Sequence, residues 1–158
     1  MTVKLAEGDP APPFALLDQN SNEVKLEDFK GRTLLLYFYP AADTPGCTTQ
    51  SCSIRDALPD LSSTGVDAVG ISPDTPEDQL KFDQKYDLGF PLLSDLDHAV
   101  ADAYGAWGTQ TYYGKSYEGI IRSSFLMDGD GRVIKAFYKV KPADTVPKAQ
   151  AALAAAAG

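Results

Sequence analysis

The chain of 158 residues is long enough for one domain with a buried core, and its 44% hydrophobic and 23% charged residues are typical of globular proteins. The formal net charge of -8 argues against nucleic acid or an anionic membrane surface as a partner, because both attract clustered lysine and arginine. No stretch approaches the roughly 18 apolar residues of a membrane span, and the first residues lack a signal-peptide core, so we expect a cytoplasmic protein without a membrane segment.

The first half of the chain contains a strand–helix–strand pattern. Residues 12–18 and 23–26 predict a small leading hairpin. The run RTLLLYFYP at 32–40 is apolar on both faces, which is typical of a central buried strand. Apolar residues at spacings of three and four predict a helix over 45–63, and VDAVGIS at 66–72 predicts a second buried strand. These three elements form one βαβ unit with parallel strands.

Three more elements follow the second buried strand. Residues 75–89 begin with a threonine cap and a proline and end at a glycine, which predicts a helix. The segment FPLLSD at 90–95 predicts a short strand, placed at the edge of the sheet because Pro91 cannot donate a ladder hydrogen bond. Residues 97–108 predict a third helix.

The C-terminal part adds a hairpin and a helix. After a polar, tyrosine-bearing loop, residues 120–128 and 132–140 flank a Gly-Asp-Gly turn and predict two antiparallel strands. The alanine-rich residues 144–158 predict a final helix. The whole chain, 1–158, is therefore predicted to be a single α/β domain with a central mixed sheet and helices on both faces. In such sheets, ligands bind beyond the carboxyl ends of the parallel strands, where the segment 40–52 lies.

Both cysteines of the chain lie in this segment, PAADTPGCTTQSC. Pro45 suits the first helical position and Thr44 the N-cap, so that Cys47 falls in the first turn. Free backbone N–H groups and the positive end of the helix dipole favour an anion there, and Gly46 allows another molecule to approach closely. A nearby guanidinium would favour the thiolate of Cys47 further.

Cys52 follows five residues later on the same predicted helix. In an unbroken helix the two Cα atoms would be roughly 8.7 Å apart, whereas a disulfide needs about 4.4–6.8 Å. Either the cysteines never join or the first turns of the helix unwind when they do. Taken alone, Cys52 also fits a small buried hydrophobic residue.

A zinc site and a thioredoxin-type motif find little support. A structural zinc ion needs four donors, and the chain offers two cysteines and His98, which we expect on the solvated surface at a helix start. No C-x-x-C motif is present. We therefore expect no structural zinc ion.

Several motifs resemble the peroxiredoxins, and specifically their bacterioferritin-comigratory-protein or PrxQ branch. The family signature P-x-x-x-T-x-x-C is matched by Pro40, Thr44 and Cys47, and Cys52 stands at the resolving position of that branch. The resemblance covers nearly the whole chain, with further matching segments at 70–74, 90–95, 103–108, 113–128 and 128–133.

The resemblance implies a thioredoxin-like fold and a thiol peroxidase that needs no cofactor and acts on hydroperoxides. Cys47 would become a sulfenic acid, Cys52 would condense with it to a disulfide, and a thioredoxin-type protein would reduce that disulfide. Arg122 would supply the guanidinium, Thr44 and the Cys47 backbone N–H would stabilise the leaving oxygen, and Pro40 would shape the pocket. The branch also favours a monomer.

Two features depart from the family pattern. Many relatives carry a lysine after the signature proline, where this chain has two alanines, Ala41 and Ala42. Gln50 stands where other relatives have an acidic residue. The missing lysine removes a positive charge from the mouth of the predicted site.

Two other classes of function remain open at this point. A non-enzymatic redox sensor would use a 47–52 disulfide to change a partner-binding surface, and would consume one equivalent of peroxide instead of many. A structural α/β binding domain would have unreactive thiols.

Overall fold

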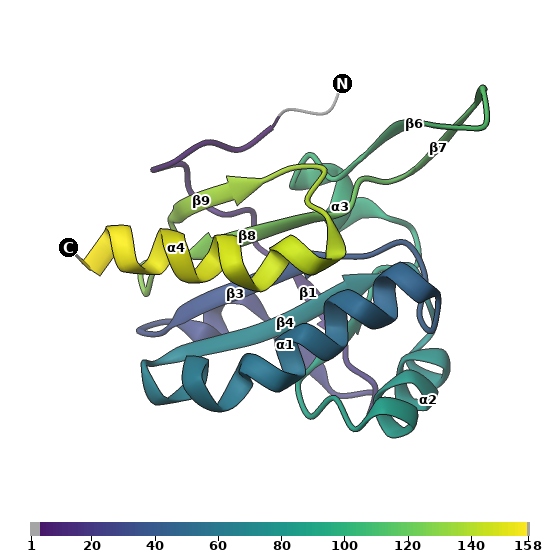
Figure 1. The fold of residues 1–158 in the computed structure, drawn as a ribbon. Helices are drawn as coiled ribbons and strands as arrows, with labels where there is room; N and C mark the ends of the chain where they lie inside the picture. Colours follow the sequence, from purple (N-terminus) through teal and green to yellow (C-terminus); the bar gives the residue numbers. More distant parts are fainter. Residues whose placement is uncertain (1–3, 158) are drawn as a thin grey trace.

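The computed structural model describes residues 4–157, and within them it contains a seven-stranded mixed sheet and a separate two-stranded hairpin (Figure 1). The strands are β1 Ala15–Leu17, β2 Glu23–Lys25, β3 Thr33–Phe38, β4 Val66–Ser72, β5 Leu92–Ser94, β6 Trp107–Tyr112, β7 Lys115–Ile120, β8 Ser123–Met127 and β9 Val133–Phe137. The helices are α1 Pro45–Ser63, α2 Pro76–Tyr86, α3 Ala99–Ala103 and α4 Thr145–Ala157, with 3-10 turns η1 Leu26–Phe29 and η2 Pro142–Asp144.

The order of strands in the large sheet is β2-β1-β5-β4-β3-β8-β9. Strands β3, β4 and β5 are parallel, and the other neighbours pair antiparallel. This arrangement confirms the predicted mixed sheet, the leading hairpin β1–β2 and the hairpin β8–β9. It also confirms the βαβ unit, since α1 connects the parallel strands β3 and β4.

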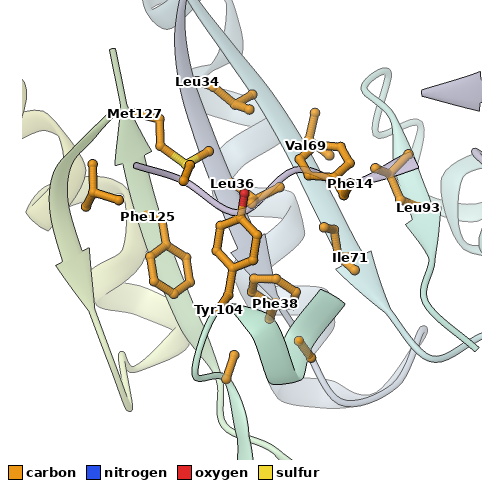
Figure 2. Packing of buried hydrophobic residues seen from close by; sticks show 14 of the residues in the cluster. Phe14, Leu34, Leu36, Phe38, Val69, Ile71, Leu93, Tyr104, Phe125 and Met127 are labelled. Atoms are coloured by element: carbon orange, nitrogen blue, oxygen red, sulfur yellow. The ribbon is translucent and has the colours of Figure 1, made fainter. Parts of the chain in front are cut away.

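Strand β3 lies inside the sheet, between β4 and β8, and separates two hydrophobic layers. Leu34, Leu36 and Phe38 pack into one layer, which Figure 2 shows together with Tyr104 near α3 and Phe125 of β8. The alternate residues Leu35 and Tyr37 pack into the other layer, together with side chains of α1, α2 and α4. Residues 34–38 of β3 are buried and apolar on both faces of the sheet, because both faces are covered. This confirms the strand that the two-sided apolar run predicted.

The prediction that β5 is an edge strand is wrong. It pairs with β4 on one side and with β1 on the other. Pro91 directly precedes the strand and contributes its carbonyl, which accepts a hydrogen bond from the Gly70 N–H at 3.0 Å. Its missing N–H therefore costs the ladder nothing, and the proline does not force the strand to the edge.

The third helix is shorter than predicted. It spans only Ala99–Ala103, because Gly105 adopts a positive φ of 75° and turns the chain into β6. His98 is not a solvated surface residue: its ring is half-buried and stacks on Trp107 with 3.7 Å between the ring centroids.

The segment predicted as a polar loop forms the hairpin β6–β7, which projects from the body of the molecule (Figure 1). Tyr113 and Gly114 at its tip both have positive φ, as a two-residue hairpin turn of the primed types requires. Thr109, Thr111 and Tyr117 have high strand propensity. However, most of β7 is exposed, so the sequence shows no apolar face from which the hairpin could have been predicted.

The final helix agrees with the prediction up to Ala157, and Gly158 lies outside the described residues. Within residues 4–157 no helix is long and apolar enough to cross a membrane.

Candidate active site

The candidate site is built on the first turn of α1, at the carboxyl end of β3 (Figure 1). Thr44 is the N-cap residue and Pro45 the first helical residue, as predicted. Cys47 follows in the first turn with a side chain that is 0% exposed. Its backbone N–H is one of those that an α-helix leaves without an intrahelical acceptor.

The hydroxyl of Thr44 does not cap the helix. It donates a hydrogen bond to the carbonyl of Ala41 at 2.9 Å and makes no side-chain bond to the first turn. Its proton is thus occupied, and the lone pairs of the oxygen are what it can offer to a bound molecule. Pro40 lies exposed in the bend that follows β3.

Arg122 meets Cys47 from the other side of the site. It lies in the short connection between β7 and β8, where Val140 N–H donates to its carbonyl at 3.0 Å. Its Nη2 is 3.3 Å from the Cys47 Sγ. The structure therefore brings together two predicted residues that are 75 positions apart in the chain. The contact gives the buried sulfur a positively charged hydrogen-bond donor.

Gln50 is a member of the site that the sequence analysis treated only as a departure from the family pattern. It is fully buried, and its Oε1 accepts a hydrogen bond from Arg122 Nη1 at 2.8 Å. The guanidinium thus uses one nitrogen on the sulfur and another on the amide. The signal that could have identified Gln50 is its spacing of three residues from Cys47, which places both on one face of the helix.

A polar network fixes the loop that leads into α1. The N–H of Ala42 donates to Asp74 at 2.7 Å, and Asp43 accepts hydrogen bonds from Lys85 at 2.8 Å and from the Tyr86 hydroxyl at 2.7 Å. The hydrogen bonds from Lys85 and Tyr86 lower the pKa of Asp43, which therefore stays ionised at neutral pH. These contacts hold the start of α1 against the end of α2.

Cys52 lies on the same continuous helix as Cys47 and is also a free thiol, partly exposed. The helical geometry estimated from the sequence, roughly 8.7 Å between the two Cα atoms, therefore applies to this form of the protein. Ser51 lies between the two cysteines in the sequence, and its buried hydroxyl is hydrogen-bonded to the hydroxyl of Tyr37 on β3 at 2.7 Å. Burial raises the pKa of Tyr37 far above its usual value, so this phenol stays neutral.

We expect Gly46→Ala to reduce the reactivity of Cys47. A Cβ on residue 46 would lie 3.0 Å from Arg122 Nη2 and 3.5 Å from Pro142 Cγ, so the guanidinium would have to move away. A shift of a few tenths of an ångström at a reacting centre costs about tenfold in kcat/KM. The stability of the protein should not fall, because alanine has a higher helix propensity than glycine. Steady-state kinetics and thermal unfolding of the variant check this. An unchanged kcat/KM would mean that Arg122 does not need its present position.

The arrangement can perform nucleophilic chemistry at sulfur. A buried thiol in the first turn of a helix is in contact with a guanidinium, and a second thiol lies on the same helix. Within residues 4–157 no cluster of three or more His, Cys, Asp or Glu side chains is placed to hold a metal ion.

Comparisons with known proteins agree with this chemistry. Residues 7–136 match the model of the AhpC/TSA family. Peroxiredoxin Bcp of Escherichia coli is 49% identical over 137 residues, which cover 87% of this chain and 88% of that protein. Peroxiredoxin Bcp of Bacillus subtilis is 42% identical over 149 residues, 94% of each chain.

Solved structures are similar over the same length. The bacterioferritin comigratory protein of Xanthomonas campestris, whose structure was studied for its alkyl peroxide reduction activity, has a TM-score of 0.87 and 32% identity over 100% of both chains. The peroxidoxin BcpB of Mycobacterium tuberculosis has a TM-score of 0.85 and 32% identity, covering 96% of this chain and 97% of that one.

Proposed function

Since the chain belongs to the AhpC/TSA family and is a peroxiredoxin of the Bcp type, we propose that Cys47 is its peroxide-reducing cysteine and Cys52 its resolving cysteine. The family, the thioredoxin-like fold and the thiol peroxidase activity predicted from the sequence are confirmed by these relatives. The assignment of Cys47 rests mainly on one observation: its sulfur, in the first turn of α1, lies 3.3 Å from Arg122 Nη2.

In the first step, the thiolate of Cys47 attacks one oxygen of a hydroperoxide and the O–O bond breaks. The leaving oxygen takes the electron pair and a proton and departs as water or an alcohol, and Cys47 becomes a sulfenic acid. Negative charge grows on the leaving oxygen, where Arg122 and the Cys47 N–H stabilise it. Because the Thr44 hydroxyl donates to Ala41, we assign it the acceptor role of orienting the O–H of the peroxide. Pro40 would line the entrance.

In the second step, Cys52 would displace water from the sulfenic acid and form a disulfide with Cys47. The Cα separation in α1 exceeds the reach of a disulfide, so the first turns of α1 have to unwind. Unwinding breaks the Tyr37–Ser51 hydrogen bond and removes Gln50 from Arg122. Each helical hydrogen bond contributes only about 0.5–1.5 kcal/mol net, so the favourable reduction of peroxide can drive this change.

We expect hydrogen exchange to reveal this unwinding. Backbone amides of residues 46–53 should lose protection when the disulfide forms, while residues 33–38 in β3 keep theirs, because β3 is paired on both sides. The measurement compares the reduced and oxidised forms residue by residue. Equal protection of 46–53 in both forms would rule out an unwound first turn.

A thiol reductant would return the disulfide to two thiols with two electrons, and we propose a thioredoxin-type protein for this role. Because both cysteines lie on one helix, resolution needs no second chain, and we propose a monomer in which residues 1–158 act as one domain. A cycle that starts from two free thiols fits the reducing cytoplasm, where we place the protein.

A coupled assay tests this proposal. The protein is given thioredoxin, thioredoxin reductase and NADPH, and NADPH consumption is followed with hydrogen peroxide and with an organic hydroperoxide. Many turnovers per protein are expected. If each protein molecule consumed only one equivalent of peroxide and then remained in the disulfide form, the result would instead indicate the non-enzymatic redox sensor.

A further inference from the structure

A chain of hydrogen bonds extends from the start of α4 to the sulfur of Cys47. Gln50 Nε2 donates to Thr145 Oγ1 at 3.0 Å, and Thr145 Oγ1 donates to the carbonyl of Lys141 at 3.3 Å. On the other side, Gln50 Oε1 accepts from Arg122, which also contacts the sulfur. Gln50 and Thr145 are both 0% exposed, so water does not replace the hydrogen bond between them.

The donors and acceptors of this chain permit only one direction. Arginine has donors and no acceptor, so it must face the oxygen of the Gln50 amide. The amide NH₂ then faces Thr145, whose oxygen must accept. The proton of Thr145 is consequently directed to the carbonyl of Lys141. Arg122 thus determines which way the amide faces, and the hydroxyl of Thr145 supplies the acceptor that the amide NH₂ needs in that orientation.

We propose that Thr145 is a positioning residue for the peroxide-reducing site: by accepting from the Gln50 amide it keeps the amide oxygen on Arg122 and the guanidinium on Cys47. This inference rests on the proposed function of Cys47 and Arg122. Nothing in the sequence around Thr145 indicates the role, because it lies 95 residues from Gln50.

Loss of the Thr145 hydroxyl removes one of the two hydrogen-bond partners that hold the Gln50 amide in place. The buried NH₂ group then lacks an acceptor, and the side chain would have to shift towards another one and away from Arg122. A flip of the amide offers no relief, because it would direct the NH₂ group against the N–H groups of Arg122. Arg122 would lose its second anchor and hold the sulfur less firmly. The segment that carries Thr145 also contacts the site directly, since Pro142 lies beside Gly46.

The test compares Thr145→Val, which keeps the shape and removes the hydroxyl, with Thr145→Ser, which keeps the hydroxyl. Two quantities are measured: the rate constant for the reaction of Cys47 with hydrogen peroxide, and the pH titration of its thiolate absorbance in a Cys52→Ser background. We expect the valine variant to react about tenfold more slowly, equal to about 1.4 kcal/mol of barrier, and its thiolate to form at higher pH. The serine variant should match the parent in both.

A purely structural role for Thr145 predicts a different result. Thr145→Val would then lower the unfolding temperature and leave the rate and the titration unchanged, which would overturn the proposal. If the second methyl of valine prevents folding, Thr145→Ala removes the hydroxyl without adding bulk and gives the same comparison. The titration needs no peroxide, so it stays interpretable even if the parent protein proves not to reduce peroxide.

A double-mutant cycle adds a second criterion. In a Gln50→Met protein, which has no amide to orient, Thr145→Val should cause no further loss of rate. Additive losses would show that Thr145 acts on the site by a route other than Gln50, and would contradict the proposal.

Discussion

Replacement of Cys47 by serine is expected to abolish peroxide reduction, with a loss of more than about 10³-fold in turnover. A serine hydroxyl is hardly ionised at neutral pH, so it cannot replace the thiolate as nucleophile. The fold should survive, because serine is slightly smaller than cysteine and its oxygen can accept the hydrogen bond that Arg122 now directs to sulfur. The coupled assay with thioredoxin measures the loss, and thermal unfolding verifies the fold.

Cys52→Ser is the matched control for this variant, since it changes the same atom in the same helix. It keeps Cys47, so it should still consume one equivalent of peroxide rapidly and form a sulfenic acid, but it should not turn over with thioredoxin. If Cys47→Ser reacted with peroxide and Cys52→Ser did not, the assignment of the two cysteines would have to be exchanged.

Arg122→Lys is expected to lower kcat/KM for hydrogen peroxide by about 10²-fold or more although the positive charge is kept. Arg122 contacts the Cys47 sulfur through one nitrogen and Gln50 through another. An ammonium is a single point with no planar fork, so it cannot hold the sulfur and the amide at once. Steady-state kinetics measure the loss, and the ultraviolet titration of the thiolate separates loss of thiolate from loss of stabilisation of the leaving oxygen.

Arg32→Lys controls for the general effect of this exchange. Arg32 also makes a two-pronged contact, to Asp67 at 2.8 and 3.1 Å, but it is exposed and lies just before β3, at the end opposite to the site. Its replacement should leave kcat/KM unchanged. A similar loss in both variants, or no loss in Arg122→Lys, would mean that Arg122 has no special part in the chemistry.

The local elements around the site follow from short-range rules that act within a few residues. Pro45 has no N–H to place and is preorganised for the first turn, so a helix starting there is determined by neighbouring residues alone. The position of Cys47 in that first turn, and its distance from Cys52, follow from helical geometry in the same way. The two-sided apolar run of β3 likewise indicates a strand covered on both faces, whatever covers it.

The sequence analysis misplaced β5 and missed the hairpin β6–β7, for two different reasons. The position of β5 inside the sheet depends on β1, which pairs with it at Leu17 and Ser94. The hairpin β6–β7 projects from the molecule, and only its base, with Trp107 and Ile120, packs in the core, so it carries no apolar alternation from which a strand could be inferred (Figure 1). Its two strands pair with each other through a two-residue turn at the tip.

The sequence by itself determined the family resemblance, which its motifs carry along nearly the whole chain, and the helix start with the Cys47 sulfur in its first turn, which depend on residues close together. The tertiary structure alone decided what surrounds that sulfur. Arg122 reaches Cys47 across 75 residues, and Thr145 reaches Gln50 across 95. No periodicity or local propensity encodes such contacts, since they arise only when β8 and α4 pack beside α1 and bury the polar groups that must then find each other.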